Sequence, residues 1–437
     1  MSENTTALRD MCEFVIDCPH FTPEWTSSGY VVVRNQNIRD GRLDLSNVSY
    51  THKEDFDRRN RRAKPRAGDI IFTREAPMGE VCIVPEGLEC CIGQRQVLLR
   101  PRADVDARYF FYALRSEFVR RQIFWNEGTG STVSNVRIPV LEALKIPRLG
   151  GVEAAIGQLL GALDDRIEVN RRMNETLEAM ALAIFKDWFV DFGPTRAKME
   201  GRAPYLASDT WALFPDQLDA EGKPEGWKWA LLGQHAAITK GKSYKSEELQ
   251  EAKTALVTLK SFARGGGYRR DGLKSFSGEC KPDQVVQEGE IVVAQTDVTQ
   301  AADVIGRPAR VISDARFERL IASLDVAVIR PLASTYLDNE FLLHLMGTER
   351  FTQHTFAHTS GTTVLHLGKN AIPSFEFILP SARLVEACFE IASPLAARQI
   401  GAVHEIDALA AARDLLLPKL MSGEIRVKDA EKIAAAA

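Results

Sequence analysis

Two short loops of nearly the same composition lie far apart in this chain of 437 residues. The first reads Gly130-Ser131-Thr132-Val133, and the second, 231 residues later, reads Gly361-Thr362-Thr363-Val364. Hydroxyl groups, together with the backbone N–H groups that a glycine leaves accessible, are suited to binding phosphate oxygens. Phosphate binding is therefore the first chemistry to consider, and its candidate residues are Ser131, Thr132, Thr362 and Thr363.

Positive charge is concentrated in two runs, although the formal net charge of the chain is −4. Residues 58–66 hold six cations in nine positions, and a second group lies within residues 264–274. A charge run is usually a solvated face, but each of these lies beside aromatic or glycine-rich sequence, which favours contact with nucleic-acid phosphates. The candidate contacts are Arg58, Arg59, Arg61, Arg62 and Lys64 in the first run, and Arg264, Tyr268, Arg269 and Arg270 in the second.

Arginine and glutamine side chains can read DNA base edges through paired hydrogen bonds. The candidates for this role are Gln94, Arg95 and Gln295, and Arg74 is a further candidate DNA contact. A further stretch, Lys240-Gly241-Lys242-Ser243, is similar to the end of a phosphate-binding P-loop, but Ala236 stands where that motif requires glycine. A solvated turn is the alternative interpretation of this stretch, whose candidate DNA contacts are Lys240, Lys242, Tyr244 and Lys245.

Catalytic motifs are missing from the sequence. No GxGxxG follows a strand-like run and no HExxH occurs. Cys12, Cys18 and His20 lack the second pair of ligands that a structural zinc site needs. The seven cysteines form no CxxC pair, so we expect reduced thiols in a cytoplasmic protein. We expect no catalytic residue, no metal site and no cofactor in this chain.

The segments around the candidate residues recur in the same order, which indicates an internal duplication of some 200 residues. Each copy mixes short strand-like runs with one or two helices, so it is typical of an α+β domain. The matched segments are residues 38–41 with 269–272, 68–75 with 289–296, 99–101 with 329–331, 106–122 with 338–353, and the two hydroxyl-rich loops.

A long helix is predicted after each copy. Between residues 156 and 188, two rows of mostly apolar residues recur every seven positions, with Asn170 and Asn174 among them, which indicates a coiled coil rather than an ordinary amphipathic helix. The second helix is expected to begin at Pro394 after Ser393 and to end before Pro418. An antiparallel pair of such helices would separate the two domains. Large apolar residues left exposed on this spacer would bind partners, and they are Phe185, Trp188 and Phe189.

With these features, the chain resembles the specificity (S) subunits of type I restriction–modification systems, the HsdS family. The most specific segments are LDDRIEVNRRMNETLEAMALAIFKDWFVDF at residues 163–192 and RDLLLPKLMSGEIRV at residues 413–427. IDCPHFTPEW at residues 16–25 and GWKWALLGQHAAITKGKSYKSEEL at residues 226–249 resemble the openings of that family's target-recognition domains. The resemblance implies recognition domains at residues 1–150 and 201–380, a central helical spacer at 151–200 and a distal helical region at 381–437.

The resemblance also implies a function. The chain would bind a two-part target in double-stranded DNA without catalysing a reaction. Its helices would dock two modification subunits, which use S-adenosylmethionine to methylate adenine, and two restriction subunits would add ATP- and magnesium-dependent translocation and cleavage. The alternatives are a free-standing DNA-binding regulator and a nuclease with an unrecognised metal site. The sequence has no apolar run of 18 residues, so no membrane partner is expected.

Overall fold

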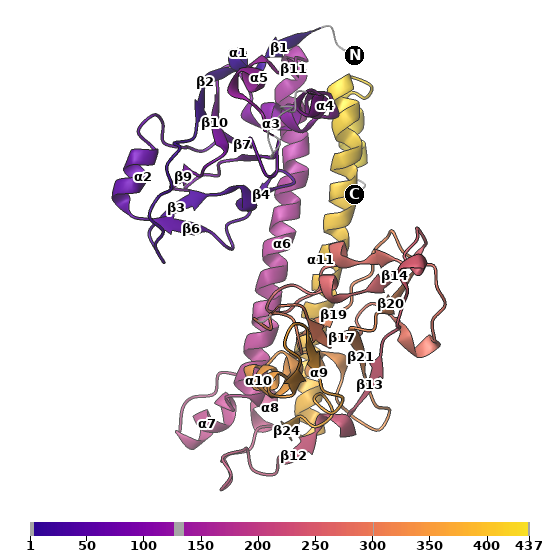
Figure 1. Cartoon of the computed structure of the whole chain (residues 1–437). Helices are drawn as coiled ribbons and strands as arrows, with labels where there is room; N and C mark the ends of the chain where they lie inside the picture. Colours follow the sequence, from indigo (N-terminus) through magenta and orange to yellow (C-terminus); the bar gives the residue numbers. More distant parts are fainter. Residues whose placement is uncertain (1–3, 126–134, 300, 436–437) are drawn as a thin grey trace. The chain divides into compact units, whose positions relative to one another are not determined.

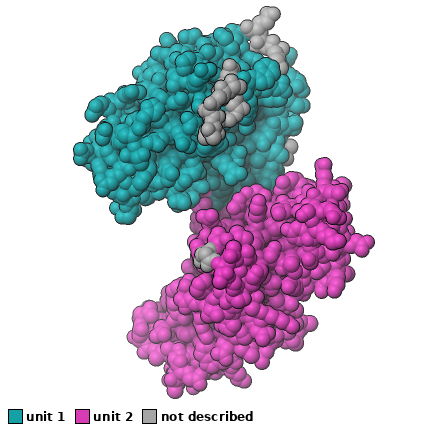
Figure 2. Space-filling view, viewed as in Figure 1, with its two compact units in different colours: residues 1–171, 403–437 teal, residues 172–402 magenta. Residues whose placement is uncertain are grey.

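The computed structural model describes residues 4–125, 135–299 and 301–435 (Figure 1). The chain forms two compact units (Figure 2). Unit 1 comprises residues 1–171 and 403–437, and unit 2 comprises residues 172–402. Two long helices, α6 (Glu153–Phe189) and α11 (Ala382–Ser422), each contribute one part to unit 1 and the other part to unit 2.

Unit 1 is built on a four-stranded sheet with the order β2-β10-β7-β8 and a three-stranded sheet with the order β6-β3-β9. Two further strand pairs, β1 with β11 and β4 with β5, complete its sheets. Its strands are β1 (Thr5–Ala7), β2 (Cys12–Asp17), β3 (Tyr30–Val33), β4 (Ile38–Arg39), β5 (Arg42–Leu43), β6 (Ser49–Thr51), β7 (Ile70–Thr73), β8 (Val81–Ile83), β9 (Cys90–Ile92), β10 (Gln96–Pro101) and β11 (Lys145–Pro147). Besides the long helices, it contains α1 (Leu8–Met11), α2 (Lys53–Arg59), α3 (Ala107–Arg115), α4 (Glu117–Trp125), α5 (Ile138–Ala143) and α12 (Val427–Ala435).

Unit 2 has the four-stranded orders β13-β21-β17-β19 and β15-β14-β20-β16, the pair β12-β24, and a small sheet β18-β23-β22. Its helices are α7 (Gly193–Met199), α8 (Ser208–Ala212), α9 (Asn339–Met346) and α10 (Glu349–Ala357). Its strands are β12 (Lys228–Leu231), β13 (Ala236–Lys240), β14 (Thr254–Val257), β15 (Lys274–Ser275), β16 (Val285–Val286), β17 (Ile291–Ala294), β18 (Thr296–Asp297), β19 (Pro308–Arg310), β20 (Arg319–Ala322), β21 (Val326–Pro331), β22 (Thr359–Ser360), β23 (Leu365–Leu367) and β24 (Glu376–Leu379).

The predicted internal duplication is confirmed by the strand pairing. In unit 1, β10 lies between antiparallel β2 and β7, and in unit 2, β21 lies between antiparallel β13 and β17. Strand β3 pairs with β9 in parallel, as β14 does with β20. Even a side-chain contact recurs: Arg100 of β10 holds the carboxylate of Asp69 through two hydrogen bonds, and Arg330 of β21 holds Glu290 in the same way. The two units are therefore copies of one α+β design.

One of the matches expected from the sequence is wrong. Residues 39–41 lie within the β4–β5 hairpin, whereas Arg270–Gly272 forms a 3-10 turn after a glycine-rich loop. The backbone gives the true correspondence, because Asp44 N–H donates to the Asn37 carbonyl at 2.7 Å and Arg269 N–H donates to the Ser261 carbonyl at 2.8 Å. The glycine-rich loop at residues 263–267 thus corresponds to the hairpin, and the similarity of the short Arg-Asp-Gly string is a coincidence.

The two long helices run antiparallel within unit 1. Arg166 of α6 donates to Glu405 of α11 at 2.7 Å, and Arg413 of α11 donates to Asp164 of α6 at 2.6 Å. In unit 2, the Gln399 side chain of α11 donates to the backbone carbonyl of Asn174 in α6. Asn170 is buried, with 4% of its surface exposed, which agrees with its predicted place on the seam.

Helix α11 is longer than the expected 394–417, because Pro394 and Pro418 lie inside it rather than at its ends. A proline inside a helix leaves the carbonyl four residues earlier without its usual donor. Those carbonyls belong to Glu390 and Asp414, which are both exposed residues, so water can satisfy them. The two prolines are therefore tolerated on the solvated face of the helix.

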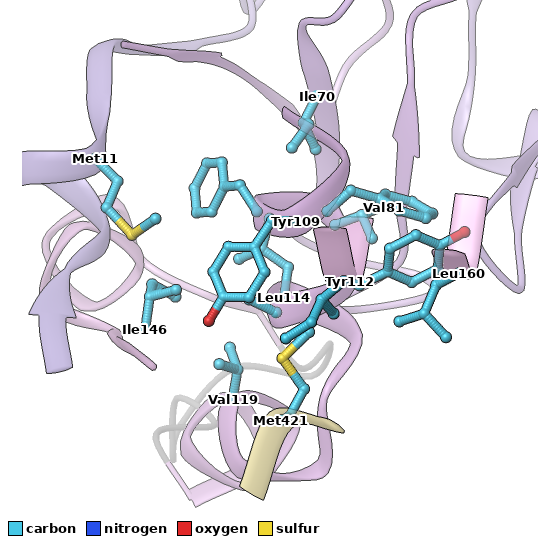
Figure 3. Packing of buried hydrophobic residues seen from close by; sticks show 14 of the residues in the cluster. Met11, Ile70, Val81, Tyr109, Tyr112, Leu114, Val119, Ile146, Leu160 and Met421 are labelled. Carbon is cyan, nitrogen blue, oxygen red and sulfur yellow. The ribbon is translucent and has the colours of Figure 1, made fainter. Parts of the chain in front are cut away.

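Each unit has its own hydrophobic core. In unit 1, Tyr112 of α3, Leu160 of α6 and Met421 of α11 belong to one buried cluster, which joins the sheet to both helices (Figure 3). The main core of unit 2 is rich in aromatic residues and includes Phe341 of α9. No helix within the described residues is long and apolar enough to cross a lipid bilayer.

Candidate nucleic-acid interface

A three-residue connection at the same place in each unit defines a shared surface. Gly93-Gln94-Arg95 joins β9 to β10, and Ser323-Leu324-Asp325 joins β20 to β21. The carbonyl of the third residue accepts the N–H of the residue that follows the neighbouring strand, β7 in unit 1 and β17 in unit 2. The Arg74 N–H donates to Arg95 at 2.8 Å, and the Gln295 N–H donates to Asp325 at 2.7 Å. The term turn edge is used for the surface that each connection forms with the end of the neighbouring strand, which is β7 in unit 1 and β17 in unit 2.

The segment that follows each hydroxyl-rich loop forms a backbone hydrogen bond with the turn edge. In unit 1, the Val136 N–H donates to the Arg74 carbonyl at 3.1 Å, and in unit 2, the Leu367 N–H donates to the Gln295 carbonyl at 2.8 Å. The loop Gly361-Thr362-Thr363-Val364 joins β22 to β23, and β23 pairs with β18 at Thr296. In unit 2, therefore, the predicted phosphate-binding loop and the predicted base-reading Gln295 lie at one edge.

Thr362 and Thr363 are both exposed on this loop. Gly361 has a φ of 110°, and a Cβ atom there would lie 2.1 Å from the Val364 carbonyl oxygen, so the turn requires glycine. The matching residues of the first loop, Ser131 and Thr132, lie outside the described residues.

The arginine run of unit 1 lies on and after α2, and five of its six cations are exposed. The Arg58 guanidinium stacks over the Phe21 ring at 4.1 Å, which holds its charge at the surface. Lys64 pairs with Glu89 at 2.5 Å, an exposed pair that contributes little to stability. Arg61 and Arg62 are also exposed, so this segment presents a cationic surface suited to phosphates.

Arg59 differs from its neighbours in this run. It is only 3% exposed, and its guanidinium donates to the Ile92 carbonyl at 2.8 and 3.0 Å and to the Phe21 carbonyl at 2.6 Å. Arg59 lies three residues after buried Phe56 on α2, so both face the same side of the helix. The expectation of a surface position was wrong for Arg59, which joins α2 to the end of β9.

We expect the triple variant Arg58→Ala, Arg61→Ala, Arg62→Ala to weaken DNA binding and to lower its salt dependence. Each lost phosphate contact lowers the slope of log K against log salt by about 0.9, so the slope should fall by about 2 to 3. The check is equilibrium binding of the purified protein to duplex DNA across a salt series. Arg59 is left in place, because its removal would unpair buried carbonyl groups.

A matched control removes the same charge elsewhere on unit 1. Arg9, Arg102 and Arg108 are about half exposed, and each has an acidic partner. Their triple alanine variant should keep a steeper slope than the α2 variant. Equal slopes for the α2 variant and the wild type would exclude the α2 surface from the interface.

Arg74 is largely buried by its contacts, with 15% of its side chain exposed. Its Nη1 donates to both oxygens of Asp17 at 2.9 Å, and its Nε donates to the Val136 carbonyl at 2.9 Å. Arg74 therefore cross-links the ends of β2 and β7 to the segment after the first loop. Gln94 and Arg95, by contrast, are exposed, and Gln94 donates to the Thr22 hydroxyl at 3.1 Å.

Two residues near the unit 1 turn edge were missed from the sequence. Trp25 is 47% exposed, and the Arg34 guanidinium lies 5.4 Å from its ring centroid. Arg34 directly follows β3, whose parallel neighbour β9 leads into the turn edge. An exposed aromatic ring beside an arginine is a surface on which nucleic-acid bases can stack. The only sequence signal was the position of Trp25 at the end of IDCPHFTPEW.

The lysine-rich stretch of unit 2 lies against the turn edge. The Lys242 N–H donates to the Ala322 carbonyl at 2.7 Å, and a Cβ atom on Gly241 would lie 2.0 Å from the Ser323 oxygen, so only glycine allows this close approach. Lys240 and Lys245 are exposed, and Lys242 is half-buried. Tyr244 packs against a small buried cluster, and burial with the nearby charge of Asp325 raises the pKa of its phenol.

The cationic group within residues 264–274 contains both exposed and partly buried side chains. Arg264 and Arg269 are exposed, and they pair with Asp303 at 3.7 Å and with Asp271 at 3.0 Å. Arg270 is half-buried and donates to the Ser313 carbonyl at 3.5 Å. The Tyr268 ring packs against the core, and burial raises the pKa of its phenol. Arg264 is the most exposed of these side chains, on a loop whose Gly265 N–H donates to the Asp303 carbonyl.

The three aromatic residues expected to face partners are buried. Phe185, Trp188 and Phe189 are 1%, 2% and 7% exposed, respectively. The Trp188 ring meets the Phe214 ring edge-on at 5.1 Å between centroids, and Phe185 and Phe189 both contact Phe341 of α9. The expectation of an exposed patch was wrong, because Phe214, Trp227 and Phe341 of unit 2 pack against these rings. No group of three metal-ligating side chains occurs among the described residues.

Comparisons with known proteins find similar sequences and a similar fold. Residues 4–179 match the model of the type I restriction modification DNA specificity domain. The specificity subunit of the type I restriction enzyme MjaIX from Methanocaldococcus jannaschii is 26% identical over 369 residues, which cover 83% of this chain and 78% of that protein. The HindI specificity subunit from Haemophilus influenzae is 24% identical over 407 residues, which cover 82% of this chain and 87% of that protein.

The fold also has a solved counterpart. The S subunit of a type I restriction–modification system from M. genitalium superposes with a TM-score of 0.55 at 16% sequence identity, covering 95% of both chains. At this identity the likeness concerns the fold. The chain is therefore similar to type I restriction–modification DNA specificity subunits, through the domain matched at residues 4–179 and through two relatives aligned over most of their length.

Proposed function

We propose that this chain recognises a two-part DNA target for a type I restriction–modification complex, with one part bound by each unit. The observation that carries this proposal is the repeated turn edge. The backbone pattern is the same in both units, whereas the side chains differ, with exposed Gln94 and Arg95 in unit 1 and exposed Leu324 and half-buried Asp325 in unit 2. A shared scaffold with different side chains suits two different DNA sequences.

Electrostatics support the assignment of these surfaces to DNA. Each turn edge is flanked by exposed cations, on α2 and its following loop in unit 1 and at Lys240 and Lys245 in unit 2. Phosphate contacts of this kind provide affinity and orientation, while side chains at the turn edge contact bases and provide specificity. The net charge of −4 does not oppose this arrangement, because the cations are gathered on particular surfaces.

We further propose that the reaction centres belong to partner subunits. Two modification subunits would carry S-adenosylmethionine and methylate adenine, and two restriction subunits would carry ATP and magnesium. The exposed apolar side chains of the long helices are the candidate contacts. They include Val169 and Met180 on α6 and Phe389 and Leu415 on α11. This chain would act by placing these partners on DNA.

The proposal predicts sequence-specific methylation that depends on this chain. The chain, co-purified with its modification subunits, should methylate a two-part motif in a DNA library at a rate about a thousandfold above that on other sequences. Omission of the chain should abolish this preference. Methylation without sequence preference in the presence of the chain would contradict the proposal, as would magnesium-dependent DNA cleavage by the isolated chain.

A further inference from the structure

The last residue of the turn edge occupies the same place in both units but has opposite chemistry. Arg95 stands directly before β10, and Asp325 stands directly before β21. Their carbonyls accept the equivalent hydrogen bonds from Arg74 and Gln295. An arginine side chain can only donate hydrogen bonds, and an ionised aspartate can only accept them.

A second pair of residues, also at equivalent places in the two units, contacts the side chains of Arg95 and Asp325. The residue that follows Arg74 is Glu75, whose carboxylate lies 3.2 Å from the Arg95 Nε. The residue that follows Gln295 is Thr296, whose hydroxyl donates to Asp325 Oδ1 at 3.0 Å. Both units therefore place a supporting side chain in the same position, and each support fits the charge of the group that it holds.

Both end residues keep hydrogen-bonding capacity toward the outside. The Arg95 side chain is 54% exposed, and its backbone has a φ of 65°, a left-handed conformation that is uncommon for a residue with a Cβ. Asp325 is half-buried, and within the described residues its Oδ2 has no hydrogen-bond partner. Nearby Asp297 shows the contrast of a structural aspartate, because both of its oxygens accept backbone N–H groups and it is 1% exposed.

The charge of Asp325 restricts what it can contact in DNA. A carboxylate repels phosphates, so a DNA-binding surface tolerates a carboxylate only where a hydrogen-bond donor of the DNA contacts it. In the major groove such donors are the exocyclic amino groups of cytosine (N4) and adenine (N6), whereas arginine pairs with the O6 and N7 acceptors of guanine. The exposed Lys240 ends β13, which pairs with β21 beside Asp325, and would provide the attraction to phosphates that the carboxylate lacks.

We propose that this shared position reads a base in each part of the target: Asp325 accepts a hydrogen bond from an amino group of cytosine or adenine, and Arg95 donates to a guanine. Glu75 and Thr296 are positioning residues that hold the two reading side chains. This inference rests on the proposed function, because it assigns base recognition to the surface that binds each part of the target.

The test maps the methylation motif of the complex of the full chain with its modification subunits. Asp325→Ala should lower the methylation rate at the wild-type motif by about 10- to 100-fold and should relax the preference at one base pair, within the part that unit 2 binds. Asp325→Asn, which keeps an acceptor for Thr296, should change the preferred base at that same pair. Arg95→Ala should relax one guanine position in the other part.

Glu318→Ala provides a matched control, because Glu318 is an acidic residue of unit 2 whose side chain is 70% exposed. Among the described residues, its one salt bridge is with Lys253. Its motif should remain that of the wild type. The inference is overturned if the wild-type complex methylates a specific motif and both Asp325 variants keep the same base preferences. If the wild-type complex has no specific motif, the proposed function itself fails, and the inference fails with it.

Discussion

Replacing Trp188 with alanine should destabilise unit 2 by about 3–5 kcal/mol, the usual cost of deleting a large aromatic side chain from a packed core. Trp188 is 2% exposed and packs edge-on against Phe214. Its deletion would leave a cavity between α6 and the aromatic core of unit 2. Denaturant unfolding, followed by tryptophan fluorescence and by circular dichroism, would measure the change in the free energy of unfolding.

Met180→Ala serves as the control for this variant. Met180 lies on the same helix, also in unit 2, but it is 47% exposed, so its replacement should change stability by no more than about 0.5 kcal/mol. If Trp188→Ala kept the wild-type unfolding midpoint and lost only its modification subunits, Trp188 would be a docking residue. The buried position would then be contradicted.

Replacing Arg413 with methionine should destabilise unit 1 by about 1.5–3 kcal/mol, because it removes the closer of two cations beside the partly buried Asp164 carboxylate and leaves Arg115 at 3.7 Å. Arg413 of α11 donates to Asp164 of α6, and Tyr112 of α3 donates to the same carboxylate. Burial, reinforced by the charge of Asp164, raises the pKa of Tyr112, so the phenol stays protonated as a donor. Asp164 thus joins both long helices to α3, and methionine preserves most of the packing of the arginine side chain.

Arg166→Met is the matched control on the same helix pair. Arg166 pairs with Glu405, but 53% of its side chain is exposed, so its loss should cost less than about 1 kcal/mol. Urea unfolding of both variants, and of Asp164→Asn with and without Arg413→Met, would give the coupling energy of the pair. Equal effects of Arg413→Met and Arg166→Met would show that the Asp164 contact does not hold the helices together.

Much of the fold could be predicted because its signals are periodic or repeated. The heptad rows from residue 156 to 188 predicted α6, and the strings around residues 68–75 and 289–296 predicted the repeated strands. Periodicity does not identify what covers an apolar face. Trp188 could therefore face a partner or its own domain, and only the packing against Phe214 decides between them. The sequence around Pro394 predicts a helix start, because it does not show that the carbonyl freed by the proline faces water.

The candidate site was predicted in part, for a related reason. Charge runs indicate cationic surfaces, but they do not separate Arg59, which points inward beside Phe56, from exposed Arg58. The correspondence of Arg95 with Asp325 was available at the sequence level, because the match of residues 99–101 with 329–331 has the same offset of 230. Similarity between residues does not reveal this correspondence, because the position keeps its backbone and changes its side chain.

The most direct test of two separate readers is an exchange of one of them. Residues 201–380 would be replaced with the corresponding segment of the Haemophilus influenzae relative, and methylated adenines would be mapped in DNA modified by the wild-type and chimeric complexes. Two units that each read their own part predict that one part of the motif changes while the other part keeps its sequence. A motif that changes in both parts, or in neither, would contradict the account.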